Sequence, residues 1–357
     1  MAAQFSPDSP RTAGPQPRDV LRLAQPSFGL IVANRAVVLG AVTVADLVDL
    51  TAQAERSGFF DAVWAGDSLL AKPRLESITL LSALAGATTK LRLGVGCMAT
   101  FVHRHPVMLA HQWASLDVLS SGRTLLAVCL GGPSDANKAQ AAEHSVMSIP
   151  SAERVGRLEE GIDILRKLFG GKNVSHRGRF YSFEDVTLEP RPVQQPCPIW
   201  VASNPTGLTW KGGASASGAV VERSFRRIAR YADGWMTNKL TPDEFRQQWS
   251  RIAAMTREEG RDPAKLGSAL YHNINITEDR QKGLEETKGF LDKYYTSNFS
   301  RQFVEQWTIS GAPKQCVEEL RAYFDAGVGH MALRVGSWDQ VGQFKRFLNE
   351  VAPALFR

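Results

Sequence analysis

Short apolar runs and longer segments of helical period alternate along residues 27–357. The repeat is clearest in residues 91–132, where the apolar run 91–99 is followed by an amphipathic segment that begins at Pro106. A second apolar run, 125–130, has no polar alternation, which is typical of a strand covered on both faces. Two such runs joined by an amphipathic segment predict a βαβ unit with parallel strands, and Pro106 suits the first turn of its helix.

The same unit recurs along the chain. Strands are predicted at 27–33, 61–67, 91–99, 125–130, 198–202, 234–237, 266–276 and 330–335. This alternation in a chain of 357 residues predicts one (β/α)8 TIM barrel with insertions over residues 27–357, with a doubly wound sheet as the alternative. The polar segment 133–150 is predicted to be a long loop and 176–198 an excursion with a short hairpin. The Gly-, Ala- and Ser-rich segment 206–221 is predicted to be a mobile lid.

Composition narrows the class of protein. Residues 1–26 are rich in Pro, Ala, Gln and Ser and lack the apolar centre of a signal peptide, which predicts a disordered N-terminal tail on a cytoplasmic protein. No apolar run reaches the about 18 residues that a membrane span needs. The net charge of +6 comes without a cluster of Lys, Arg and aromatic residues, so it favours an anionic small ligand over nucleic acid. The four cysteines form no CxxC pair and are predicted to be reduced thiols.

In a barrel of this kind the chemistry lies at the carboxyl ends of the strands. The residues that follow the predicted strands are mostly polar and neutral, with no carboxylate pair and no Ser-His-Asp set, which argues against glycosidase and serine-hydrolase chemistry. Such a site suits a cofactor that brings its own reactivity. His103 and His105 have no third ligand nearby in the sequence, and we expect no metal site.

Three stretches resemble the luciferase-like monooxygenases, the bacterial-luciferase superfamily. They are Leu91-Arg92-Leu93-Gly94, Arg104-His105-Pro106-Val107 and the run from Ala114 to Arg123, and the similarity extends from about Phe28 to the C-terminus. The resemblance implies the barrel independently of the hydrophobic pattern. It also implies a flavin at the strand ends, with Asp67 as a flavin-binding residue and the flavin phosphate at Ser203-Asn204.

The chain departs from that family at two places. Luciferases have Glu-His where this chain has Asp67-Ser68, so the catalytic type of histidine is absent. Ser151 and Val155 replace a His and a Tyr of the alkanesulfonate branch, and Arg154 is a candidate to compensate. No catalytic residue is assigned, His103 being the candidate that remains. The predicted cofactor-binding residues are Asp67, Ser68, Cys97, Met98, Ala99, Gly131, Gly132, Ser151, Arg154, Ser203 and Asn204.

The resemblance implies a flavin-dependent monooxygenase. Reduced FMN and dioxygen would oxygenate a small organic substrate, a separate flavin reductase would supply the reduced flavin, and the protein would be a homo-oligomer, a dimer or tetramer. The first alternative is hydride transfer with the deazaflavin coenzyme F420. The second is a flavin-binding protein without catalysis, suggested by the missing histidine.

Overall fold

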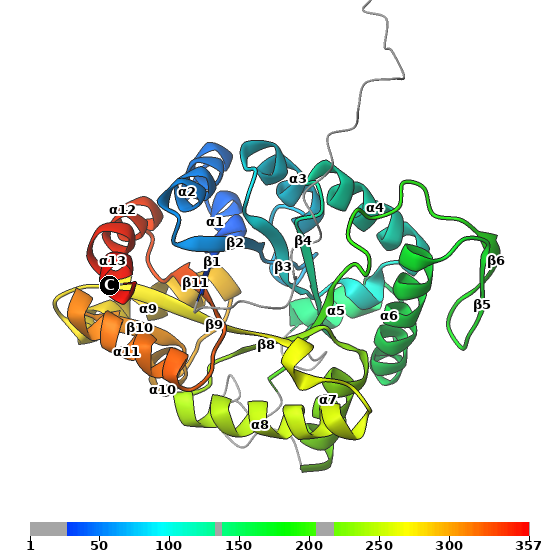
Figure 1. The fold of residues 1–357 in the computed structure, drawn as a ribbon. Helices are drawn as coiled ribbons and strands as arrows, with labels where there is room; N and C mark the ends of the chain where they lie inside the picture. Colours follow the sequence, from blue (N-terminus) through cyan, green and yellow to red (C-terminus); the bar gives the residue numbers. More distant parts are fainter. Residues whose placement is uncertain (1–26, 133–137, 205–217, 357) are drawn as a thin grey trace, which may run out of the picture.

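The computed structural model describes residues 27–132, 138–204 and 218–356, in which parallel strands close into a barrel surrounded by helices (Figure 1). The barrel strands are β1 (Ser27–Val32), β2 (Phe60–Ala65), β3 (Arg92–Met98), β4 (Thr124–Val128), β7 (Ile199–Ala202), β8 (Gly234–Asn238), β9 (Gly267–Ile276) and β11 (His330–Val335). Because β1 pairs with both β2 and β11, and β8 pairs with β9, the sheet closes on itself. The prediction of a TIM barrel is confirmed, and the doubly wound alternative is discarded.

Helices cover the outside of the barrel. They are α2 (Val44–Ser57), α3 (Ser77–Ala87), α4 (Pro106–Leu119), α6 (Arg154–Gly170), α7 (Gly218–Tyr231), α8 (Pro242–Glu258), α9 (Arg280–Tyr295), α10 (Arg301–Gln306), α11 (Pro313–Asp325) and α12 (Gln340–Arg346). Shorter helical pieces are α1 (Asn34–Val38), α13 (Ala352–Leu355), the 3₁₀ turns Phe101–His103, Ser151–Glu153 and Pro263–Lys265, and the π-helical turn Phe347–Val351. Thr43 forms a capping box at the start of α2, and Gly58 ends this helix in a left-handed conformation. Pro106 begins α4, as predicted.

Two elements differ from the prediction. The expected loop 133–150 contains a helix, α5 (Lys138–Val146). Its buried side chains are polar, so the sequence has no helical repeat of apolar residues that would predict it. A short strand, β10 (Thr308–Gly311), extends the sheet beside β9. The expected hairpin is present as β5 (Val174–Arg177) and β6 (Ser182–Val186). The predicted tail 1–26 and most of the predicted lid 206–221 lie outside the described residues.

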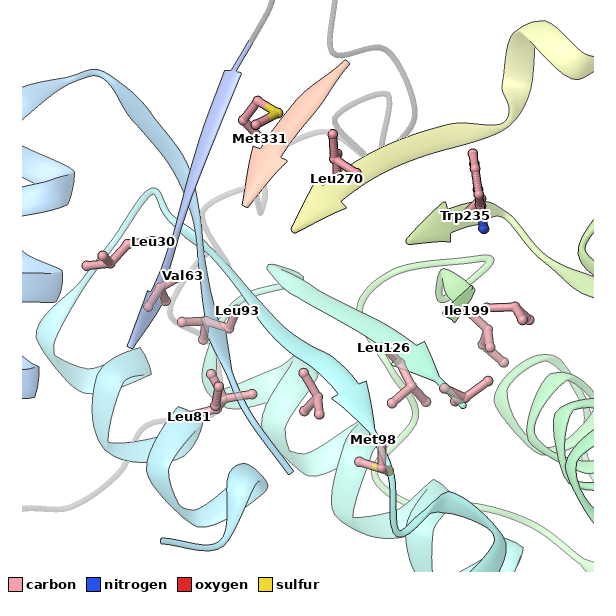
Figure 2. Close-up of a cluster of buried hydrophobic side chains, with 14 of the residues drawn as sticks. Leu30, Val63, Leu81, Leu93, Met98, Leu126, Ile199, Trp235, Leu270 and Met331 are labelled. Atoms are coloured by element: carbon pink, nitrogen blue, oxygen red, sulfur yellow. The ribbon is translucent and has the colours of Figure 1, made fainter. Parts of the chain in front are cut away.

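The main hydrophobic core lies between the barrel and its helices. Alternate side chains of the strands point outward into this layer, and Figure 2 shows Val63, Leu93 and Leu126 there, with Leu81 of α3. The layer runs around the barrel and includes side chains from every barrel strand, which accounts for the apolar outward face of the strands.

Inside the barrel, two tryptophans are among the largest side chains of a second hydrophobic cluster. The rings of Trp64 and Trp200 lie 6.2 Å apart, centre to centre, and both side chains are buried. The strands that face these rings carry glycine: Gly29 and Gly94 around Trp64, and Gly234 and Gly267 around Trp200. A Cβ atom at any of these glycines would overlap an indole ring. The two indoles thus fill the part of the interior beside them, and the cavity described below lies at the carboxyl ends of the strands.

We expect Gly94→Ala to lower the free energy of unfolding by about 1–3 kcal/mol, because its methyl group would overpack the Trp64 ring. Gly289→Ala is the control, since this glycine lies in α9 with open space around its Cβ position. An alanine there should raise the free energy of unfolding by about 0.5–1 kcal/mol. Urea unfolding of the two variants measures both changes. Equal stabilities for Gly94→Ala and the wild type would contradict the packing account.

Candidate active site

A cavity of about 280 Å³ opens at the carboxyl ends of the barrel strands. Each barrel strand, or the residues directly after it, contributes to its wall. The wall also includes side chains from the segment after β2 and from the region of α9 and α10. This is the position at which barrel enzymes of this type carry their chemistry.

Seven of the predicted cofactor-binding residues lie on the cavity wall. They are Asp67, Cys97, Ala99, Gly131, Gly132, Ser203 and Asn204. All seven lie at or just after the carboxyl end of a strand, where sites in barrels of this kind are expected. Whether they bind a cofactor stays a prediction.

Met98 does not reach the cavity. Its side chain is fully buried in the outward-facing core layer, near Leu126 in Figure 2. The pairing of β3 with β4 shifts register between Gly96 and Met98, so Cys97 and not Met98 faces the mouth. Including Met98 in the site was wrong because the sequence pattern gave no sign of this bulge.

Ser68, Ser151 and Arg154 also lie off the wall. Ser68 donates a hydrogen bond to Glu143 (3.4 Å), and Ser151 is exposed at the start of a 3₁₀ turn. Arg154 is buried and donates to the backbone carbonyl of Gly131 (3.0 Å). It therefore fixes the loop that forms part of the wall, instead of presenting its charge to a ligand.

His103 is held behind the wall. Its Nε2 lies 3.1 Å from Nδ1 of His144, whose Nε2 lies 3.0 Å from the carbonyl oxygen of Gly132. Burial lowers the pKa of His103, so its ring is neutral near pH 7. This chain of contacts ties α5 to the loop after β4, and it gives His103 a structural role in place of the catalytic one that was considered for it.

Asp67 is held rigidly at the mouth. Its carboxylate accepts hydrogen bonds from the amide and hydroxyl of Thr100, both 2.7 Å, and from the hydroxyl of Ser77 (3.0 Å). Arg104 lies 3.5 Å away. Among the described wall residues it is the one carboxylate.

Four cationic side chains face the same cavity, and the sequence analysis missed them as site residues. They are Lys72, Arg74, Lys239 and Arg334. Burial lowers the pKa of Lys239 to about 8. Arg334 is almost completely buried and donates to Asn273 and to the hydroxyl of Tyr295 (2.8 Å). With one carboxylate against four cations, the described wall carries a positive surplus that favours an anionic ligand.

Aromatic rings form the side of the cavity next to these cations. They are Tyr271, Tyr294, Tyr295, Phe299, Phe303 and Trp307. The hydroxyls of Tyr271 and Tyr295 are 3.2 Å apart. On the opposite side, the thiols of Cys97 and Cys129 are in hydrogen-bonding contact, and all four cysteines are free, as predicted.

A family model described as luciferase-like monooxygenase matches residues 27–209 and 216–330. This match covers most of the chain and includes the barrel strands from β1 to β9. The chain belongs to the luciferase-like monooxygenase family. It is accordingly an oxidoreductase, and the resemblance read from the sequence is confirmed.

Known proteins of this family are similar along nearly the whole chain. The F420-dependent glucose-6-phosphate dehydrogenase of Amycolatopsis mediterranei is 24% identical over 332 residues, 87% of this chain and 94% of that protein. The protein of the same name from Intrasporangium calvum is 26% identical over 329 residues, again 87% and 94%. A solved F420-dependent secondary alcohol dehydrogenase, in complex with an F420-acetone adduct, has the same fold. Its TM-score is 0.75 at 18% identity, covering 93% of this chain and 99% of that one.

These relatives overturn the predicted reaction. They are named for coenzyme F420 and for dehydrogenation, so the prediction of an FMN-dependent monooxygenase is wrong, and the flavin reductase that accompanied it has no support. The reason is chemical. Polar, neutral strand ends suit any flavin-like ring, and the sequence pattern held no feature that separates FMN from a deazaflavin.

Within the described ranges, no helix is long and apolar enough to cross a membrane. In the same parts of the chain, no three His, Cys, Asp or Glu side chains gather where they could hold a metal ion.

We expect Lys239→Met to raise the free energy of unfolding at pH 7 by about 1–3 kcal/mol, because the folded wild type must keep a buried ammonium charged. The pKa of Lys239 is about 8 when folded and about 10.4 when unfolded, so the unfolded chain binds more protons between these values. Wild-type stability therefore gains from this group as pH rises through that window, and the advantage of the variant fades by about pH 10.

Urea unfolding at pH 7 and at about pH 10 measures this difference. Lys314→Met is the control, because the Lys314 side chain is 89% exposed. Its effect on stability should be the same at both pH values. An advantage of Lys239→Met that did not change with pH would contradict the buried-charge account.

Proposed function

We propose that this protein is an F420-dependent oxidoreductase that transfers hydride between the deazaflavin and a small alcohol or carbonyl substrate. The observation that carries the proposal is the positive surplus on the wall of the cavity at the barrel mouth. The names of its relatives agree with it. Coenzyme F420 is a flat deazaflavin with an anionic, phosphate-bearing side chain, and it supplies a hydride acceptor when bound.

The residues of the cavity suit such a molecule. Glycine backbone leaves part of the wall without side chains, at Gly66, Gly96, Gly131 and Gly132. At Gly131 the backbone has a φ of +72°, and a Cβ would come within 2.9 Å of the Ala99 carbonyl oxygen. A side chain there would be strained and would crowd β3, so the flat surface beside β3 and β4 depends on glycine.

The anionic side chain would be held near β7 and β8. Ser203 and Asn204 follow β7 on the wall, which supports the phosphate prediction, and Lys239 follows β8. Their hydroxyl, amide and ammonium groups are the donors that a phosphate accepts from. Asp67, fixed by Thr100 and Arg104, would orient the ring through its edge.

The substrate would lie against the aromatic side of the cavity. The rings from α9 to Trp307 exclude water, and the cations among them favour a polar oxygen or an anionic group on the substrate. The curated relatives are named for glucose 6-phosphate, an alcohol that carries a phosphate. A homo-oligomer and a cytoplasmic location stay predictions.

F420 should bind to the purified protein more tightly than FMN, and the bound F420 should be reduced by one or more simple alcohols. The cofactor test is an anaerobic titration that follows quenching of protein fluorescence, since Trp307 lies on the cavity wall. Turnover is measured as loss of F420 absorbance with glucose 6-phosphate and secondary alcohols. Tight FMN binding without F420 binding would overturn the proposal, and F420 binding without turnover on any alcohol would favour a non-catalytic binding protein.

Asp67→Asn should weaken F420 binding by about 1–3 kcal/mol if the carboxylate contacts the ring, the cost of a lost buried hydrogen bond. Glu76→Gln is the matched control, because Glu76 also binds Arg104 (2.8 Å) but lies off the cavity wall. Both variants should lose some stability, and only the first should lose affinity. Equal F420 affinity in both would mean that Asp67 only fixes the loop.

A further inference from the structure

Oxidation of an alcohol by hydride transfer needs a group that takes the hydroxyl proton. Ser68 occupies the position of the luciferase histidine and lies off the cavity wall. Asp67 already accepts three hydrogen bonds and lies beside Arg104. The proton acceptor must therefore be sought elsewhere among the described wall residues.

Tyr295 combines access with a suitable electrostatic setting. It is the last residue of α9, lines the cavity, and is partly exposed. Its hydroxyl accepts a hydrogen bond from Nη1 of Arg334 (2.8 Å) and lies 3.2 Å from the hydroxyl of Tyr271. The Nζ of Lys72 lies 5.4 Å from the centre of its ring.

We propose that Tyr295 is the catalytic acid–base of the hydride transfer, with Arg334, Lys72 and Arg74 stabilising its phenolate. This inference rests on the proposed F420-dependent function. It names a residue that neither the sequence pattern nor the resemblance pointed to.

The cations and the hydroxyl next to Tyr295 all lower the pKa of its phenol. Burial by itself raises the pKa of Tyr295, but Arg334 and Arg74, the hydrogen bond from Tyr271, and Lys72 together hold that pKa below the ordinary tyrosine value. Burial raises the pKa of Tyr271, whose hydroxyl lies 3.2 Å from that of Tyr295. The ring of Tyr294 packs against Arg334, with its centre 4.7 Å from the guanidinium carbon.

Arg334 has no carboxylate among its described partners. Its guanidinium donates to Asn273 and Tyr295 and is surrounded by aromatic rings, five of them within 5.6 Å. A buried cation of this kind is stabilised when a neighbouring hydroxyl becomes an anion. The phenolate of Tyr295 would provide that anion until a proton arrives from the substrate.

In the direction of alcohol oxidation, the substrate O–H bond would break and its proton would move to the phenolate oxygen of Tyr295. The adjacent C–H bond would break with its electron pair leaving as hydride, and the C–O bond would become C=O. F420 bound in the cavity would supply the two-electron acceptor for that hydride, and the proton on Tyr295 would then return to water.

The first experiment needs no cofactor. Near-ultraviolet absorbance of the protein is followed as pH rises, so that each tyrosinate is detected as it forms. The wild type should show one tyrosine that ionises before the others, and Tyr295→Phe should lack that early step. Tyr323→Phe is the control, because Tyr323 is buried against His272 (3.0 Å) away from the cavity and should leave the early step in place. Survival of the early step in Tyr295→Phe would overturn the proposal.

The second experiment uses F420 and whichever alcohol the wild type oxidises. Tyr295→Phe should lower kcat by about 10²–10⁴-fold, the range for loss of a general base. Its F420 dissociation constant should stay within about threefold, a change of less than about 1 kcal/mol. If Tyr295→Phe keeps the kcat of the wild type, the role of Tyr295 is wrong and the F420-dependent function still holds. If the wild type does not bind F420, the proposed function itself is wrong.

Lys72→Met tests the electrostatic part without touching the hydroxyl. Loss of this cation should move the early tyrosinate step, and the rising limb of the kcat profile, to higher pH, whereas Lys72→Arg should leave both near their wild-type positions. Identical pH profiles for Lys72→Met and the wild type would contradict the role assigned to Lys72. This variant keeps the Tyr295 hydroxyl and its bond to Arg334, so it also serves if Tyr295→Phe folds poorly.

Discussion

The filling of the barrel interior by Trp64 and Trp200 is the constraint on which the rest of the molecule depends. Two indole rings lie next to each other inside the barrel, and glycines on the facing strands leave space for them. A Cβ atom at any of those glycines would overlap an indole ring, so the rings could not keep their present packing. Because these rings fill the interior beside them, the described cavity lies at the carboxyl ends of the strands. Packing at one end of the barrel thus decides where the chemistry lies.

At the mouth, the dominant feature is a buried positive charge. Arg334 comes from β11 and is held by Asn273 and Tyr295 instead of by a carboxylate. Burying a cation without a counterion is costly, and proteins usually pair such groups. Here the aromatic rings and hydroxyls around Arg334 reduce that cost, and the charge stays available to an anion in the cavity. The site thereby trades stability for electrostatic complementarity to its ligand.

The barrel and half of the site could be predicted from the sequence, because both follow from the repeat of apolar runs. The end of each run placed Asp67, Gly131 and Ser203 at the mouth. Tyr295 could not be found this way, because it ends a helix with no motif of its own. The four cations on the cavity wall were also out of reach, since the fold gathers them from β8, β11 and the segment after β2.

The helix α5, which the sequence pattern did not predict, binds segments on two sides of the cavity mouth. Its Glu143 accepts hydrogen bonds from the amides of residues 69–71, between 2.7 and 3.1 Å, and so fixes the segment that leads into Lys72. His144, the next residue of the same helix, contacts the carbonyl oxygen of Gly132 and the ring of His103. A helix with a polar buried face therefore joins the two sides of the mouth. Its sequence has no apolar stripe because its role is to hold backbone groups in place, and that requires carboxylate and imidazole groups in the positions where a packing helix has leucine.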